Sequence, residues 1–204
     1  AAGALTLNNV ANGTTFTVNG ASGGNQTVNI KDAATGTADT LNVVFANATG
    51  GTVTAANVET VNLSSSVSKG GSTATLVATS ATKAVITGSS FLTLTVTGNT
   101  KLTTIDASAA SGALTVTAAA SSATTITGGS GADKLTASSK ADILIGGAGN
   151  DVLTSGTGLG SMTGGEGNDD VTIVAPANVN SYTTITDMAV GDKVTFAAGG
   201  ASAF

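Results

Sequence analysis

Aliphatic and hydroxyl residues alternate with a period of two along most of this chain. Because successive side chains of a strand point to opposite faces, this alternation predicts short strands with one aliphatic face and one Thr-rich face. The clearest examples lie at residues 16–20, 26–30, 40–45, 59–63, 94–97, 102–106, 114–117 and 124–128. Glycine pairs such as Gly50–Gly51 and Gly70–Gly71 separate the earlier segments and predict turns.

The aliphatic positions recur at steps of 18 to 21 residues, which indicates stacked coils rather than a globular core. They fall on two tracks, which we assign to the opposite sheets of a parallel β-solenoid. One track contains Ile86, Ile105, Ile126 and Leu144, and the other contains Val96, Val116, Leu135, Leu153 and Val171. The predicted fold class is all-β, with an irregular β-helix that continues into a calcium-binding parallel β-roll.

Three copies of one nonapeptide, spaced 18 residues apart, predict the calcium sites of that roll. They read GGSGADKLT from Gly128, GGAGNDVLT from Gly146 and GGEGNDDVT from Gly164. In the pattern G-G-x-G-x-D-x-U-x, the glycines permit a tight turn with positive φ and the aspartate supplies a hard carboxylate oxygen. The predicted metal-binding residues are Asp133, Asp151, Asp169 and the turn glycines Gly128, Gly129, Gly131, Gly146, Gly147, Gly149, Gly164, Gly165 and Gly167. A flexible linker is the alternative for glycine-rich sequence, but a linker does not keep a nine-place template in phase.

Two damaged copies lie between the intact ones and predict that only one edge of the roll binds metal. They begin at Ala137 and Ser155, and they keep the nine-residue length and the aliphatic residue at the eighth place. If two nonapeptides form one coil, the intact turns stack on a shared edge. We therefore expect one ion between Asp133 and Asp151 and another between Asp151 and Asp169. On the opposite edge Asp142 faces Gly160, so a site there is expected to be weak or absent.

Other acidic residues are weaker candidates for metal binding. Asp39 precedes a Leu-x-Val segment like that of a roll unit, and together with Asp32 it is a candidate for another calcium site. A solvated loop is the favoured interpretation for both, as it is for Glu59 and Asp106.

A C-terminal segment follows Pro176, the single proline of the chain. Residues 182–196 contain Asp187 and Asp192 on either side of a glycine, flanked by apolar residues. This arrangement predicts a hairpin-like closing element, whose carboxylates complete a calcium site against Asp169. An ordinary polar turn is the alternative.

The composition agrees with a thin-cored, calcium-dependent solenoid. The 204 residues are 41% hydrophobic but only 3% aromatic and 9% charged, so large side chains for a thick core are lacking. Without cysteine there is neither a disulfide nor a thiolate ligand. A net charge of −5 excludes a basic surface for nucleic acid, and no apolar run is long enough to span a bilayer.

The same composition excludes the common catalytic arrangements. The chain has no histidine, so neither a Ser-His-Asp triad nor an H-E-x-x-H zinc site can form. Ser22 lies in a G-x-S-x-G pattern, and Ser66 and Lys69 match S-x-x-K, but the companion motifs of both are missing. We therefore predict that this chain is not an enzyme.

The nonapeptides, with the Ile-x-Asp and Gly-Asp-Lys segment that follows them, resemble the RTX (repeats-in-toxin) calcium-binding family. The Thr/Ala-rich upstream half is similar to RTX-containing surface-layer proteins of Gram-negative bacteria, in their C-terminal part. This resemblance implies type I export of an unfolded chain, folding in external calcium, and assembly of a two-dimensional lattice at the cell surface. It also implies anchoring to lipopolysaccharide or another glycan through other parts of the protein. The chain begins with Ala and shows no signal peptide, so we expect a processed or excised piece.

We expect three segments: a Thr/Ala-rich irregular solenoid at 1–123, the roll at 124–175 and the closing segment at 176–204. The favoured function is a structural surface-layer component. One alternative is the calcium-gated secretion module of a larger exported toxin, protease or adhesin. Another is an adhesin or ice-binding solenoid that uses ladders of threonine; against it, the uneven coil length predicts that Thr positions drift from coil to coil.

Overall fold

Two parallel β-sheets run the whole length of the molecule. The computed structural model describes residues 4–19, 24–46, 48–66, 70–96, 98–119, 121–174 and 183–197. Within these residues it contains nineteen strands and no helix, and therefore no helix able to cross a membrane. Odd-numbered strands form a ten-stranded sheet and even-numbered strands a nine-stranded sheet.

The ten-stranded sheet contains β1 (Leu5–Val10), β3 (Gln26–Ile30), β5 (Thr49–Ala55), β7 (Ser72–Val77), β9 (Leu92–Val96), β11 (Leu114–Thr117), β13 (Lys134–Thr136), β15 (Val152–Thr154), β17 (Asp170–Ile173) and β19 (Lys193–Phe196). The nine-stranded sheet contains β2 (Thr15–Asn19), β4 (Thr40–Ala46), β6 (Thr60–Ser65), β8 (Lys83–Gly88), β10 (Thr104–Ala110), β12 (Thr125–Thr127), β14 (Ile143–Ala148), β16 (Ser161–Glu166) and β18 (Thr184–Ile185).

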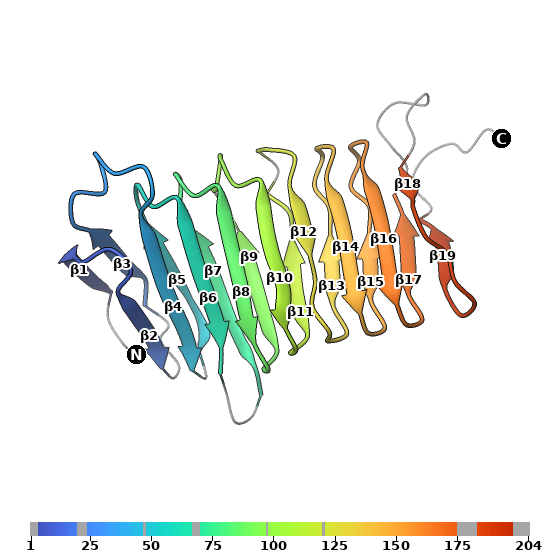
Figure 1. Cartoon of the computed structure of the whole chain (residues 1–204), viewed down its shortest axis with the longest axis horizontal. Coiled ribbons are helices and arrows are strands. Elements are labelled where there is room, and N and C mark those ends of the chain that lie inside the picture. Colours follow the sequence, from blue (N-terminus) through green and yellow to red (C-terminus); the bar gives the residue numbers. More distant parts are fainter. Residues whose placement is uncertain are drawn as a thin grey trace.

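Because consecutive strands alternate between the sheets and every pairing is parallel, each coil consists of one strand from each sheet. The coils follow one another along the long axis of the molecule, as Figure 1 shows. The predicted parallel β-solenoid is therefore confirmed. We call the turns from odd to even strands the upper edge and those from even to odd strands the lower edge, as they lie in Figure 1.

The core between the sheets is narrow and almost entirely aliphatic. Alternate strand residues are buried, as in β4, β6 and β9, and the opposite residues face outward. Phe45 is the one aromatic residue among the fully buried large side chains of the described residues. Each coil buries its aliphatic strip against its neighbours, so no coil is a stable unit by itself.

The two aliphatic tracks lie on opposite sheets, as predicted, but their upstream ends were misaligned. In the roll, Leu135 pairs with Leu153 and Ile126 pairs with Leu144. Farther upstream, Ile105 pairs with Ala84 rather than Ile86, and Val116 pairs with Leu94 rather than Val96. A slip of two residues keeps each side chain on the inner face, so alternation alone cannot detect it.

Threonines form a continuous row on the outer face of the ten-stranded sheet, contrary to the expected drift. Each member pairs with the next through successive parallel strands, and all are at least partly exposed. This threonine file consists of Thr52, Thr75, Thr95, Thr117, Thr136, Thr154, Thr172 and Thr195. The turns absorb the differences in coil length, and the hydrogen-bonded ladders keep the strands in register.

Candidate metal centre

A column of aspartates occupies the lower edge of the last coils. Asp133, Asp151, Asp169 and Asp192 each immediately precede a strand of the ten-stranded sheet, and the following residues pair in register. The first three are only 1% exposed. The sixth-place aspartates of the three intact nonapeptides therefore lie directly above one another, in the arrangement that the predicted calcium sites require.

Each carboxylate in this column bonds to the coil before it through one oxygen. The Asp133 N–H donates to Asp151 Oδ1 at 2.7 Å, and the Asp151 N–H donates to Asp169 Oδ1 at 2.8 Å. Asp133 Oδ1 in turn accepts the Leu114 N–H at 2.7 Å. These charge-assisted bonds hold consecutive turns together and fix the orientation of each carboxylate.

The second carboxylate oxygen differs between the first unit and the two that follow. Asp133 Oδ2 accepts the Gly129 N–H at 2.7 Å. Asp151 Oδ2 and Asp169 Oδ2 are buried and have no hydrogen-bond partner. A buried carboxylate oxygen without a partner is costly, and a bound cation removes that cost.

The first glycine of each nonapeptide keeps space open beside the carboxylate. A β-carbon on Gly146 would overlap Asp151 Oδ2 and the carbonyl oxygen of Gly164. One on Gly128 would overlap the corresponding pair, Asp133 Oδ2 and the carbonyl of Gly146. Gly164 faces Asp169 Oδ2 in the same way. Carboxylate and carbonyl oxygens thus converge from neighbouring coils, and hard oxygen ligands of this kind suit calcium.

The other glycines allow the turns to stack closely. Gly147 and Gly165 have φ values of 111° and 104°, and a β-carbon on either would overlap a backbone carbonyl of the preceding coil. The fourth-place glycines Gly149 and Gly167 share both features. In the first unit, Gly129 and Gly131 also approach the backbone of the preceding coil closely, although neither has a positive φ.

The expected positive φ is absent from the first-place glycines Gly128, Gly146 and Gly164. At these positions the glycine is required by the nearby aspartate oxygen instead.

Burial and mutual repulsion make the column electrostatically unfavourable without metal. The pKa of Asp151 is raised to about 7, mainly by burial and in smaller part by the neighbouring charges of Asp133 and Asp169, while the Asp133 N–H bond opposes the shift. Burial also raises the pKa of Asp133, although N–H bonds from Gly129 and Leu114 oppose the shift. No group of three or more acidic, histidine or cysteine side chains converges within the described residues, so backbone carbonyls must supply much of any coordination shell.

The C-terminal segment adds another coil rather than the hairpin predicted from the sequence. β18 and β19 belong to different sheets and pair in parallel with β16 and β17. Asp192 extends the aspartate column, because its Oδ1 accepts the Asp169 N–H at 2.9 Å. Its Oδ2 accepts the Ala189 N–H, and these two bonds lower the Asp192 pKa. Pro176 and Tyr182 lie outside the described residues.

Asp187 takes the place of a first glycine in this last coil. Its two oxygens accept the N–H groups of Gly164 at 2.8 Å and Gly165 at 2.9 Å. Residues 187–195 read DMAVGDKVT and align place for place with GGEGNDDVT, which the sequence analysis missed. The shared aspartate, aliphatic residue and threonine at places six, eight and nine were the available signal.

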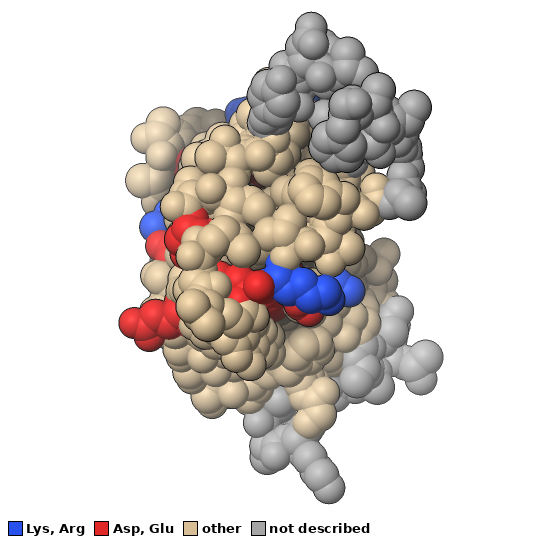
Figure 2. Space-filling view, turned by 90° about the vertical axis from the view of Figure 1, so that its right-hand side faces the viewer, with Lys and Arg blue, Asp and Glu red and all other residues tan. Residues whose placement is uncertain are grey.

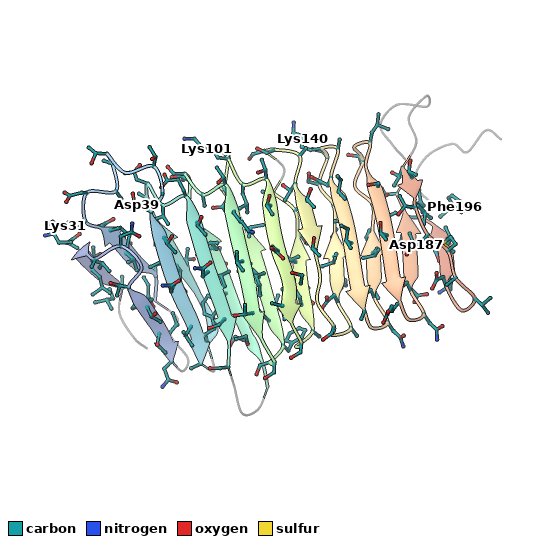
Figure 3. The ribbon with its side chains drawn as sticks, viewed as in Figure 1. Lys31, Asp39, Lys101, Lys140, Asp187 and Phe196 are labelled. Carbon is teal, nitrogen blue, oxygen red and sulfur yellow. The ribbon has the colours of Figure 1, made fainter. Side chains whose placement is uncertain are left out.

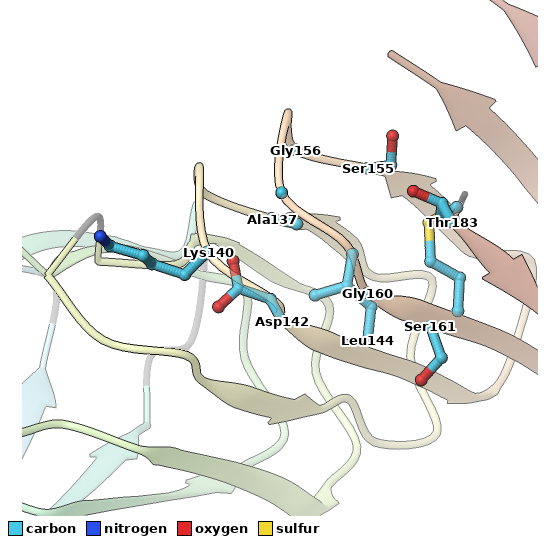
Figure 4. Close-up of a pocket in the computed structure, with 11 residues that line it drawn as sticks. Ala137, Lys140, Asp142, Leu144, Ser155, Gly156, Gly160, Ser161 and Thr183 are labelled. Atoms are coloured by element: carbon cyan, nitrogen blue, oxygen red, sulfur yellow. The ribbon is translucent and has the colours of Figure 1, made fainter. Parts of the chain in front are cut away.

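Asp142 occupies the equivalent position on the upper edge but needs no cation. Its Oδ1 accepts the Thr124 N–H, and its Oδ2 accepts both the N–H and the hydroxyl of Ser138. Figure 4 shows Asp142 beside Gly160 at a pocket of this edge that lacks a second carboxylate. The protein thus satisfies both oxygens itself.

The remaining acidic candidates divide into two kinds. Asp106 forms an ion pair with Lys83 at 3.2 Å and accepts the Ser108 hydroxyl, and the Ser108 bond is the main cause of its lowered pKa. Asp32 is exposed, as expected for a solvated loop. For Asp39 the favoured solvated-loop interpretation was wrong, because this residue is 6% exposed and its Oδ2 has no hydrogen-bond partner. Ser22 and Lys69 lie outside the described residues.

Residues 127–159 match the RTX calcium-binding nonapeptide repeat in four copies. A comparison with curated proteins returns no match. RTX nonapeptide repeats bind calcium, so calcium is the cofactor of this roll. RTX repeat proteins are typically exported by type I secretion, which indicates an extracellular location.

Proposed function

We propose that this chain is a structural component of a bacterial surface layer, which folds and assembles into a two-dimensional lattice when calcium binds. The observation that carries the proposal is the continuity of the two sheets. The calcium-binding coils pair directly with the Thr-rich coils, because β13 bonds to β11 and β12 bonds to β10. Calcium at one end therefore stabilises a single long scaffold.

The surface of the solenoid supports self-association. Apolar side chains are exposed on the last coil, among them Met188 at 51%, Val190 at 101% and Phe196 at 70%. Figure 2 looks onto this end and shows acidic and basic side chains within a largely uncharged surface, and Figure 3 labels Phe196 there. Among the described residues, β18 and β19 are the last strands of their sheets, and an unpaired strand edge is a template for pairing.

No enzymatic activity is part of the proposal. The titratable side chains that gather on the lower edge are engaged by backbone N–H groups or face the turn glycines. Without cysteine the chain has no thiol nucleophile, and without histidine a general base would have to be a carboxylate, a lysine or the single tyrosine. Lattice contacts and an anchor to lipopolysaccharide or another glycan remain expectations from the family resemblance.

Electron microscopy of the purified chain, with and without added calcium, tests the proposal. Ordered sheets that form in calcium and disperse in chelator would support the lattice. Dispersed monomers at all calcium concentrations would contradict it and favour the alternative of a calcium-gated secretion module.

The threonine file favours a second candidate, a solenoid that binds an ordered surface. Eight threonines in register present hydroxyl and methyl groups at the spacing of parallel strands, about 4.8 Å. A regular array of this kind suits a periodic partner such as ice or a crystalline glycan. Growth of faceted ice crystals in its presence, abolished by replacing Thr95 and Thr117 with lysine, would support this candidate over the lattice.

A further inference from the structure

Four described glycines face an aspartate so closely that a β-carbon would overlap one of its carboxylate oxygens. Three of them, Gly128, Gly146 and Gly164, begin the intact nonapeptides of the lower edge. The fourth is Gly36, whose β-carbon would overlap Asp39 Oδ2. Gly36 and Asp39 lie on the upper edge in the N-terminal part of the solenoid, where Figure 3 labels Asp39, far outside the residues that match the calcium-binding repeat.

Asp39 shares a second property with the roll aspartates. Asp39 Oδ2, Asp151 Oδ2 and Asp169 Oδ2 are the buried side-chain oxygens of the described residues that lack any hydrogen-bond partner. Asp39 is 6% exposed, and no described lysine forms an ion pair with it. A buried carboxylate oxygen without a partner is costly, and a bound cation offsets that cost.

The neighbouring coil supplies a second acid in the same arrangement as in the roll. Glu59 precedes β6 as Asp39 precedes β4, and the residues that follow them, Thr40 and Thr60, pair in register. The Asp39 N–H donates to Glu59 Oε2 at 2.9 Å, which matches the bond from Asp133 to Asp151. The Glu59 N–H returns a bond to the carbonyl oxygen of Asp39 at 3.1 Å. Two acidic residues thus lie one coil apart, joined by two hydrogen bonds.

We infer that Asp39 and Glu59 form a calcium site on the upper edge, separate from the sites of the nonapeptide roll. In this site Asp39 Oδ2 is the buried ligand, the Glu59 carboxylate, which accepts the Asp39 N–H, is the second acidic ligand, and Gly36 leaves room beside Asp39 Oδ2. Gly36 and its neighbours in the turn are exposed, so water has access to complete the shell of a hard cation. This site places calcium toward the far end of the solenoid from the roll.

The short turn explains why the nonapeptide pattern does not mark this site. Gly36 and Asp39 are three residues apart, whereas the first glycine and the aspartate of a nonapeptide are five apart. The N–H groups of Thr35 and Gly36 both donate to the carbonyl of Asp32. These hydrogen bonds close the turn, whereas the turns of the nonapeptides are built on glycines at places one, two and four. The same glycine-to-carboxylate contact is therefore reached from a different sequence.

The test is an anomalous-scattering map of the full chain crystallised with calcium, together with a calcium count per chain in solution. A peak beside Asp39 Oδ2 in the wild-type map, and the loss of one ion per chain in Asp39→Asn, support the site. Asp142→Asn is the matched control: it lies on the same edge, but both its oxygens already have protein donors, so the count stays unchanged. Gly36→Ala keeps the charge, fills the space and loses the same ion.

An empty position beside Asp39 in the wild-type map, or an unchanged calcium count in Asp39→Asn, overturns the inference. If Asp39→Asn does not fold, the wild-type map alone decides. Calcium in the roll without calcium at Asp39 would refute this site and leave the proposed function intact.

Discussion

Asp151 on the lower edge and Asp142 on the upper edge differ in one contact. Both are 1% exposed, both precede a strand, and both accept a backbone N–H from the preceding coil at 2.7 Å. Ser138 satisfies the second oxygen of Asp142, whereas that of Asp151 has no partner. Ser138 stands at the second place of its nonapeptide, where the intact copy has Gly147. Ser138 therefore donates to the second oxygen of Asp142 through both its backbone N–H and its hydroxyl, whereas Gly129 donates to Asp133 Oδ2 through its backbone N–H alone.

Chelation should have the largest effect, and it should act on the lower edge. A site with a Kd of about 10⁻⁴ M contributes roughly 2.7 kcal/mol at a hundredfold excess of calcium. Losing two such sites removes about 5 kcal/mol, which is comparable to the whole stability of many domains. We expect far-UV circular dichroism to show partial loss of β-structure in chelator and its return in millimolar calcium, and the structure that remains in chelator to unfold at a lower urea concentration. The same spectrum in both conditions would contradict a calcium-dependent roll.

The effect of Asp151→Asn on the free energy of unfolding should change sign between calcium and chelator. In calcium it weakens both sites that share Asp151, at a cost of about 3 kcal/mol or more in unfolding free energy. In chelator it should stabilise the chain, because a buried, repelled carboxylate becomes neutral. Urea unfolding under both conditions measures this.

Asp142→Asn provides the comparison for that experiment. It should lower the free energy of unfolding by about 1–3 kcal/mol with or without calcium. The reason is that the amide of asparagine would place an N–H donor or a single oxygen where the N–H and hydroxyl of Ser138 now donate to a carboxylate oxygen. Equal and calcium-independent losses in the two variants would remove the distinction between the edges.

The pH dependence of the calcium-free chain should follow Asp151. Its folded-state pKa of about 7 lies above the value of about 3.9 in an unfolded chain, so the folded state binds more protons between these values. Stability is therefore highest below pH 4 and falls as the pH rises toward 7, by up to about 4 kcal/mol. Urea titrations in chelator at pH 5 and pH 7.5 measure the slope, which Asp151→Asn should flatten. With calcium present, acid should instead weaken ion binding.

Asp106→Asn should have the smallest effect on stability. Its carboxylate bonds to Lys83 and Ser108 at a partly exposed position, where ion pairs contribute up to about 1 kcal/mol. Thermal unfolding should show a small loss that is equal with and without calcium. A calcium-dependent loss would place Asp106 among the metal ligands.

The sequence predicts which residues stack in neighbouring coils only where the coil length is constant. Within the roll, an 18-residue period specifies which residues stack, so the column of Asp133, Asp151 and Asp169 followed from spacing alone. Upstream, coils of unequal length left Ile86 and Val96 misaligned by two residues, and the register of the threonine file was not foreseen.

The sequence by itself determined the all-β class, the two-sheet solenoid and the aspartate column, because alternation and an exact repeat are local, periodic signals. Only the tertiary structure decided that Asp39 is buried against Gly36, that Ser138 satisfies Asp142, and that residues 187–195 complete another coil. These outcomes depend on turn conformation and on contacts between coils. Burial and hydrogen-bond partners belong to the stacked chain, and no single coil contains them.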